Sequence, residues 1–294
     1  MIVVSGASGQ LGGLITRELL ERIEPGRLRL LTREPSRLRD IPPSVDVVRA
    51  DFDDPATLPA AFAGASVLML VSTDRIDDRA AQHARAIDAA RDQGARRVVY
   101  TSMISPGEEN PALIAESHRA TEEKLRAGDG EWTILRCGFY ADFQVFEAAD
   151  ALAAGRLVHN RGDGRCAYVA RADIARCAAA VLAEDGHDDA VYELTGSEAL
   201  SADELAQLYS RVGGSHVEAI GLDDDAYLDA LGGSTDGHVQ YGLALAVSLG
   251  QAMRRGLHAQ VSDDVERLTG RAPQRVEDLL AAHASSLRAA AHGD

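Results

Sequence analysis

Glycines recur near the start of the chain at a spacing that can hold a phosphate. They lie in the segment Gly6-Ala7-Ser8-Gly9-Gln10-Leu11-Gly12, directly after the apolar run Ile2–Val4. Between a strand and a helix, such glycines permit a tight bend, close approach of backbone N–H groups to a pyrophosphate, and close packing of the helix. A tight turn without a ligand is the alternative. The position favours a dinucleotide site, to which we assign Gly6, Ser8, Gly9, Gln10, Leu11 and Gly12.

The residue at position 33 bears on which dinucleotide would bind. Arg33 stands 21 residues after Gly12, at the end of the second apolar run. The residue that contacts the adenosine ribose is expected about 20 residues past the last glycine. An acidic residue there would bind the free 2′-hydroxyl of NAD, whereas a guanidinium pairs with the 2′-phosphate of NADP. The sequence therefore predicts NADPH, and an ion pair on a helix surface, with Glu34 and Arg37 close by, is the alternative.

Asp51 and Phe52 follow the third apolar run. Here Asp51 is placed to accept a hydrogen bond from the adenine amino group, while Phe52 lines the base. Asp53 and Asp54 precede Pro55, so they are equally suited to cap the next helix.

The elements that must position these residues alternate between short β-branched runs and helical patterns. This alternation is typical of βαβ units and predicts a Rossmann-type, doubly wound parallel sheet in an α/β fold. The helical period is clearest over 11–20, which Pro25-Gly26 brings to an end; Pro55 begins a later helix and Gly94 ends another. The predicted strands are Ile2–Val4, Leu28–Leu31, Val45–Val48, Val67–Val71, Val98–Thr101 and Thr133–Leu135.

The alternation loosens after about residue 138. We expect residues 1–138 to form the NAD(P)-binding domain, with later strands returning to its sheet, and residues 139–294 to form mainly a smaller, mostly helical substrate-binding lobe. In that half the pattern predicts a helix over Phe143–Ala154, a short strand around Tyr168, a helix capped by Asp173 and a strand over Val191–Leu194. The glycine-rich segment 232–237 is either a mobile loop over a pocket or a plain connector.

Composition excludes several classes of protein. The 294 residues are 46% hydrophobic and carry a net charge of −16, which disfavours nucleic-acid binding. The three cysteines have no C-x-x-C spacing and the histidines no H-x-x-x-H spacing, so we expect no metal and a reducing compartment. The first apolar run is too short for a signal or a membrane span, so we expect a cytoplasmic protein without membrane partners.

Six short motifs lie along the chain, at Gly6–Gly12, Leu31–Arg33, Asp51-Phe52, Tyr100–Ser102, Leu135–Tyr140 and Val261–Arg271. Taken together, they resemble the NmrA-like atypical short-chain dehydrogenase/reductases, and within them the NAD(P)H-dependent quinone oxidoreductases. The resemblance covers almost the whole chain. It implies a Rossmann domain, a smaller substrate lobe, and a nicotinamide near Ser102 and the turn 137–140, so Ser72, Ser102 and Gly138 complete the expected cofactor site.

The proton donor of the wider superfamily is absent. Its members use a Tyr-x-x-x-Lys pair, in which the lysine lowers the tyrosine pKa. Lys124 is the only lysine of this chain, and position 120 is alanine rather than tyrosine. The catalytic residue therefore stays unassigned. Residues that could contact a substrate, each with an ordinary turn, helix-surface or core role as its alternative, are Ser105, His118, Phe139 and Tyr140.

These features predict an NADPH-dependent reductase that transfers hydride to a ketone carbonyl of a bulky aromatic, polyketide-like substrate, as in antibiotic biosynthesis. A neighbouring phenol on such a substrate can supply the proton. Simple quinone reduction is the first alternative. A non-enzymatic NADP-binding regulator is the second, because the glycine turn is intact and the superfamily's triad is missing. An isomerase that uses a bound nicotinamide transiently is the third. The oligomeric state is left open.

Overall fold

The computed structural model describes residues 1–75, 77–232 and 236–292. Its main element is a seven-stranded sheet in the order β3-β2-β1-β4-β5-β6-β8, with every neighbouring pair parallel. This order confirms the predicted doubly wound sheet. The strands are β1 (Ile2–Val4), β2 (Leu28–Thr32), β3 (Asp46–Arg49), β4 (Val67–Leu70), β5 (Arg97–Met103), β6 (Glu131–Cys137) and β8 (Ala190–Leu194).

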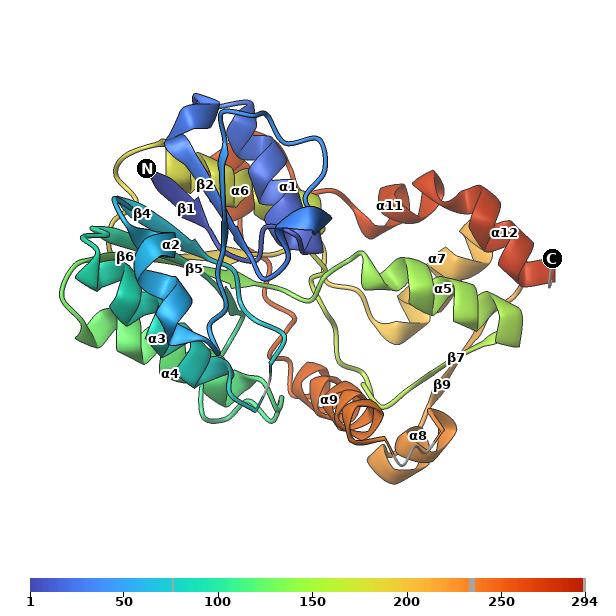
Figure 1. Cartoon of the computed structure of the whole chain (residues 1–294). Coiled ribbons are helices and arrows are strands. Elements are labelled where there is room, and N and C mark those ends of the chain that lie inside the picture. Colours follow the sequence, from blue (N-terminus) through green and yellow to red (C-terminus); the bar gives the residue numbers. More distant parts are fainter. Residues whose placement is uncertain (76, 233–235, 293–294) are drawn as a thin grey trace.

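Helices cover both faces of the sheet (Figure 1). One face is covered by α1 (Gln10–Leu20), α6 (Arg171–Ala183) and α10 (Asp264–Thr269). The other is covered by α2 (Leu58–Phe62), α3 (Arg79–Asp92) and α4 (Ala115–Ala127). Because both faces are buried, central strands such as β1 and β4 are apolar throughout.

The sequential order of the strands reverses between β1 and β4. In open parallel sheets a crevice forms at this point, outside the carboxyl ends of the strands. The glycine turn that follows β1 and the segment 71–75 that follows β4 therefore meet at the same edge of the sheet. Short 3₁₀ turns lie along the connections of this half, at η1 (Pro25–Arg27), η2 (Pro35–Arg37) and η3 (Pro55–Thr57).

A second hydrophobic core lies beside the sheet, on the right of Figure 1. The capping box of Ser201 and Glu204 begins one of its helices, and Gly155, with φ of +66°, ends another. The elements of this half are α5 (Phe143–Ala154), α7 (Ala202–Gly213), α8 (Asp224–Ala230), α9 (Gly237–Arg254), α11 (Val276–Ala282), α12 (Ala284–His292) and the parallel pair β7 (Arg156–His159) and β9 (Glu218–Gly221).

Two local predictions are wrong. Tyr168 lies in no strand; only a single bridge joins the adjacent Val169 to Tyr140. Asp173 does not cap α6, because the helix begins two residues earlier and the Asp173 carboxylate accepts from the Gln274 N–H at 2.8 Å. Pro55 opens the helical segment after β3 as predicted, since it is the first residue of η3, which runs directly into α2.

Most of the remaining predictions of the fold concern the second half of the chain. Helix α5 has the predicted bounds, and β8, α6 and α10 return from the second half to the sheet. The division at residue 138 remains our proposal. The predicted loop 232–237 lies partly outside the described residues. Within the described part of the chain, no helix has the length and apolar character that a membrane span requires.

Candidate cofactor and substrate site

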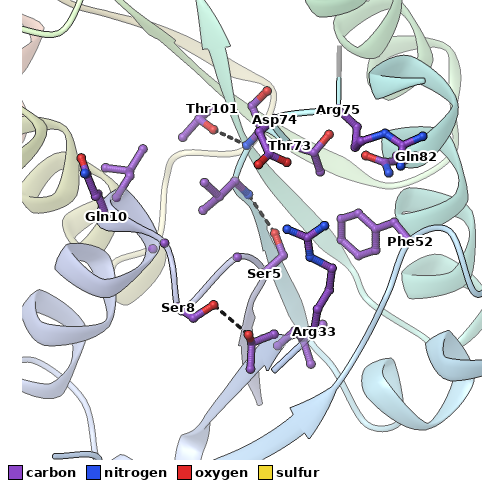
Figure 2. A pocket seen from close by; sticks show the side chains of 18 of the residues that line it. Ser5, Ser8, Gln10, Arg33, Phe52, Thr73, Asp74, Arg75, Gln82 and Thr101 are labelled. Atoms are coloured by element: carbon purple, nitrogen blue, oxygen red, sulfur yellow. Dashed lines mark hydrogen bonds between the residues drawn. The ribbon is translucent and has the colours of Figure 1, made fainter. Parts of the chain in front are cut away.

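A cleft of about 640 Å³ opens at the carboxyl ends of β1, β2, β4 and β5. Figure 2 shows its side chains converging from these strands and from the start of α3. Eleven of the residues assigned from the sequence line it: Gly6, Ser8, Gly9, Gln10, Leu11, Gly12, Arg33, Asp51, Phe52, Ser72 and Tyr140.

The glycine turn brings the first helix unusually close to the preceding loop. Gly6 has φ of +62°, a conformation that residues with a side chain rarely adopt. A Cβ on Gly12 would lie 2.2 Å from the Gly6 carbonyl oxygen, so only glycine fits there. The hydroxyls of Ser5 and Ser8 fix the turn to the sheet, since Ser5 Oγ accepts from the Val71 N–H at 3.0 Å and Ser8 Oγ lies 2.8 Å from Thr32 Oγ1.

This turn leaves the N-terminus of α1 open toward the cleft. The first N–H of the helix with a backbone acceptor is that of Gly13, which donates to the Gly9 carbonyl at 2.9 Å. The N–H groups of Gln10, Leu11 and Gly12 donate to no described residue. Unpaired N–H groups and the helix dipole together attract an anion such as a pyrophosphate.

Two arginines line the cleft beyond β2. Arg33 and Arg37 are exposed, and within the described residues neither forms an ion pair with a carboxylate. The alternative ion pair with Glu34 is therefore not formed. Two free guanidiniums at one end of a cleft provide charge-assisted donors for a phosphate.

The cleft wall after β3 is held by hydrogen bonds around one carboxylate. Asp53 receives hydrogen bonds from Gln82 at 2.9 Å and from Arg85 at 3.0 Å, and the first of these is the main reason that its pKa lies below the usual value. Asp51 Oδ1 accepts from the Asp53 N–H at 3.1 Å. Neither Asp53 nor Asp54 caps a helix with its side chain, and Phe52 lines the cleft between these contacts and Arg33.

Polar atoms without partners mark the cleft wall after β4. The Ser72 N–H donates to Thr101 Oγ1 at 2.8 Å, which joins β4 to β5. Ser72 Oγ, Thr73 Oγ1 and Gln82 Oε1 are buried and have no hydrogen-bond partner among the described residues, although all three residues line the cleft. Such atoms are costly unless a ligand satisfies them. Together with the open helix end and the free arginines, they fit a dinucleotide.

The other assigned residues lie outside the cleft lining. Ser102 Oγ donates to Glu122 at 2.7 Å, and Glu122 is also ion-paired with Arg136. His118 Nδ1 lies 2.7 Å from the Tyr100 hydroxyl, and burial holds its pKa well below the usual value. Ser105 occupies a turn with φ of +50°.

Two more of these residues act in packing. A Cβ on Gly138 would lie 2.9 Å from the Ala167 carbonyl oxygen, so glycine is required there for close backbone packing. Phe139 packs its ring against Phe143 and Tyr168. Of the four predicted substrate contacts, only Tyr140 reaches the cleft.

Several cleft residues were not anticipated. Thr73, Asp74, Arg75 and Gln82 follow β4, and Phe143, Phe146 and Arg171 come from the second half of the chain. The sequence offers one signal for them, because Phe143 and Phe146 occupy neighbouring turns of a predicted helix just after Tyr140. No spacing marks Arg171. No group of three metal-ligating side chains is found in the described ranges.

Comparison with known proteins agrees with this geometry, since residues 6–185 match the family of NAD(P)H-binding domains. The chain belongs to this NAD(P)H-binding family. Quinone oxidoreductase 2 of Escherichia coli is 32% identical over 232 residues, which cover 79% of this chain and 81% of the relative. The solved NADPH complex of the Escherichia coli NADPH-dependent quinone oxidoreductase superposes with a TM-score of 0.90 at 28% identity, covering 98% of this chain and 99% of that one.

Two further members extend the comparison. Citrobacter triphenylmethane reductase, solved with NADP(H), has a TM-score of 0.88 at 30% identity and covers 97% of this chain and 100% of its own. An NmrA-like oxidoreductase of Aspergillus flavus is 27% identical over 236 residues, which cover 78% of this chain and 76% of the relative. The predicted fold, family and NAD(P)H cofactor are thereby confirmed.

Proposed function

We propose that this NAD(P)H-dependent oxidoreductase transfers a hydride from NADPH to a ketone carbonyl of a bulky, planar aromatic substrate. The observation that carries the proposal is an aromatic wall beside the cofactor cleft. The wall is formed by Tyr140, Phe143 and Phe146, all of which line the cleft. Phe143 is 44% exposed and Phe146 is 68% exposed, which leaves their rings available to a ligand.

The arrangement of the wall suits a flat molecule. The rings of Tyr140 and Phe143 are nearly parallel, with an angle of 5° between their planes and centroids 6.3 Å apart. These side chains come from residues after 138, which supports our assignment of 1–138 to the cofactor and of 139–294 mainly to the substrate. The triphenylmethane reductase among the relatives supports a large aromatic substrate.

Different residues of the chain bind different parts of the cofactor. The open N–H groups of Gln10, Leu11 and Gly12 hold the pyrophosphate, and Arg33 with Arg37 holds the 2′-phosphate. Asp51 and Phe52 contact the adenine. Ser72 and Thr73 offer their unpartnered hydroxyls at the nicotinamide end, and Ser102 and Gly138 support that end from behind. Bound NADPH supplies the hydride, and the residues supply its orientation.

Quinone reduction is the second candidate, since the Escherichia coli relatives are named for it. Quinones fit the same wall and need less help with protonation, because their reduced oxygens are less basic. Both candidates make the partner a small aromatic molecule. A polyketide substrate, a role in antibiotic biosynthesis and a cytoplasmic location remain predictions.

The proposal is tested by mixing the protein with NADPH and either α-tetralone or menadione, and following the absorbance of the reduced nicotinamide. We expect steady consumption with α-tetralone and recovery of the alcohol, identified by mass spectrometry. Consumption with menadione alone would favour the quinone candidate. Tight binding of NADPH without its consumption would favour the non-enzymatic regulator. Conversion of the substrate without net consumption of NADPH would indicate an isomerase.

A further inference from the structure

The cleft contains one phenol whose hydroxyl is unused by the protein. Tyr140 follows β6 and lines the same cleft as Ser72 and Thr73, the two residues that we assign to the nicotinamide end. Its hydroxyl makes no hydrogen bond to a described residue, and it is not among the polar atoms sealed inside the protein. The hydroxyl is therefore free to donate to a ligand in the cleft.

The ring that carries this hydroxyl is held firmly in place. The Arg171 guanidinium carbon lies 4.6 Å from the centre of the Tyr140 ring. Arg171 is itself anchored by Asp142, which accepts from its backbone N–H at 2.9 Å and lies 3.6 Å from its guanidinium. The backbone next to the ring is also fixed, because the Ala141 N–H donates to the Val169 carbonyl at 2.8 Å. A fixed ring with a free donor is a preorganised group.

The other proton donors considered from the sequence are engaged elsewhere. Ser102 donates to Glu122, and His118 is bonded to Tyr100. Lys124 forms an ion pair with Asp88 at 2.7 Å on the outer side of α4 and does not line the cleft. The remaining cleft hydroxyls belong to serines and threonines, which are weaker acids than a phenol.

We propose that Tyr140 is the catalytic proton donor, with its hydroxyl hydrogen-bonded to the substrate carbonyl oxygen. The inference rests on the proposed function. The carbonyl carbon accepts the hydride with its two electrons while the nicotinamide is oxidised, the C=O π bond breaks, and the oxygen takes the phenolic proton. Water returns a proton to the Tyr140 oxygen. A phenol held by Arg171 thus replaces the absent Tyr-x-x-x-Lys pair.

The electrostatic surroundings agree with this role. Burial raises the pKa of Tyr140 above its ordinary value, so the group is protonated at neutral pH and available as an acid. The neighbouring Arg171 opposes this rise and stabilises the phenolate that forms when the proton leaves.

The test uses the full chain with Tyr140→Phe, which keeps the ring and its stacking and removes only the hydroxyl. We expect kcat/KM for α-tetralone to fall by about 10²- to 10⁴-fold, the range for general acid catalysis. The loss with menadione is smaller, because its reduced oxygen is less basic. The Kd of NADPH, measured by calorimetry, stays within about twofold of wild type, since the cofactor contacts are untouched.

Tyr192→Phe is the matched control. Tyr192 also lies close to an arginine, Arg267, whose guanidinium carbon is 5.6 Å from its ring, and its hydroxyl lies 2.7 Å from His187 Nδ1. It does not line the cleft. The control therefore loses a tyrosine hydroxyl without loss of turnover.

A binding measurement separates this inference from the proposed function. Protein saturated with NADP⁺ cannot reduce α-tetralone, so calorimetry can measure the Kd of α-tetralone without turnover. The difference in this Kd between wild type and Tyr140→Phe reports the hydrogen bond, and we expect the variant to bind about two- to tenfold more weakly. If the wild type does not turn over α-tetralone but Tyr140→Phe binds it more weakly than wild type, the proposed function is wrong and the hydrogen bond from Tyr140 stands. A Tyr140→Phe variant equal to wild type in both turnover and binding would overturn the donor and keep the proposed function.

Discussion

At the scale of single residues, cofactor choice depends on the two arginines after β2. Arg33 and Arg37 are exposed, line the cleft and lack carboxylate partners within the described residues. A guanidinium bonded to a phosphate contributes about 1.5–3 kcal/mol, which corresponds to about 10- to 150-fold in affinity. Arg33→Asp should therefore weaken NADPH by at least this factor and leave NADH nearly unchanged, as measured by titration calorimetry.

The nearby Arg39 is the matched control for this prediction. It is exposed, forms no ion pair with a described residue and does not line the cleft. Arg39→Asp makes the same change of charge outside the cleft. Any change in its NADPH affinity therefore reports long-range electrostatics and not a lost contact. Equal losses of NADPH and NADH affinity in Arg33→Asp would contradict the assignment of Arg33 to the 2′-phosphate.

At the scale of elements, the approach of α1 to the glycine turn decides whether the pyrophosphate is held. A Cβ on Gly12 would lie 2.2 Å from the Gly6 oxygen and 2.7 Å from the Gly6 carbonyl carbon. Backbone atoms cannot move aside cheaply, so Gly12→Ala should displace the helix and destabilise the protein by about 1–3 kcal/mol. We expect a lower urea midpoint and a loss of NADPH affinity of tenfold or more.

Gly13→Ala provides the comparison one residue further along the same helix. Its Cβ would lie 3.6 Å from the Ala7 oxygen, an ordinary contact. Alanine favours a helix over glycine by about 0.5–1 kcal/mol, so this variant should be as stable as wild type or slightly more stable. If both variants bind NADPH as wild type does, the close approach at Gly12 is not what holds the cofactor.

At the scale of the whole molecule, the sequence predicts the main sheet and helix α5 well, but it misses the small sheet of the second half. Apolar runs locate the seven parallel strands of the main sheet to within a few residues, because most of these strands are buried on both faces. Strands β7 and β9 were missed. They form a two-stranded pair at the surface, and the partly exposed Glu218–Gly221 has no continuous apolar run.

The sequence predicts which segments reach the site, but not which side chains of each segment face the cleft. Side chains alternate along a strand, so neighbours face opposite ways. Thr101 lines the cleft, while the adjacent Ser102 bonds to Glu122. Tyr140 reaches the cleft while Phe139 packs into the second core. Arg171 is brought there only by tertiary packing, which no local spacing reveals.

Three buried histidines, two of which flank the ring of Tyr100, make the stability of the protein sensitive to acid. Burial lowers the pKa of His83 to about 3 and that of His258 to about 4, and it holds the pKa of His118 well below the usual value. Both ring nitrogens of His258 are buried, and neither has a hydrogen-bond partner in the described part of the chain. Each of these side chains is therefore neutral in the folded protein at pH values where it is protonated in the unfolded chain.

The direction of the pH effect follows from proton uptake. Below about pH 6.5, the pKa of an unperturbed histidine, the unfolded chain binds more protons than the folded one, so stability falls by up to about 1.4 kcal/mol per pH unit for each group. The carboxyls whose pKa is lowered, such as that of Asp224 at about 2, titrate only at more acidic pH. The urea midpoint should thus fall steadily between pH 6.5 and 4.5. His258→Phe should make the urea midpoint less dependent on pH, whereas replacement of the exposed His283 should not. An unchanged pH dependence in His258→Phe would show that His258 is already protonated in the folded protein.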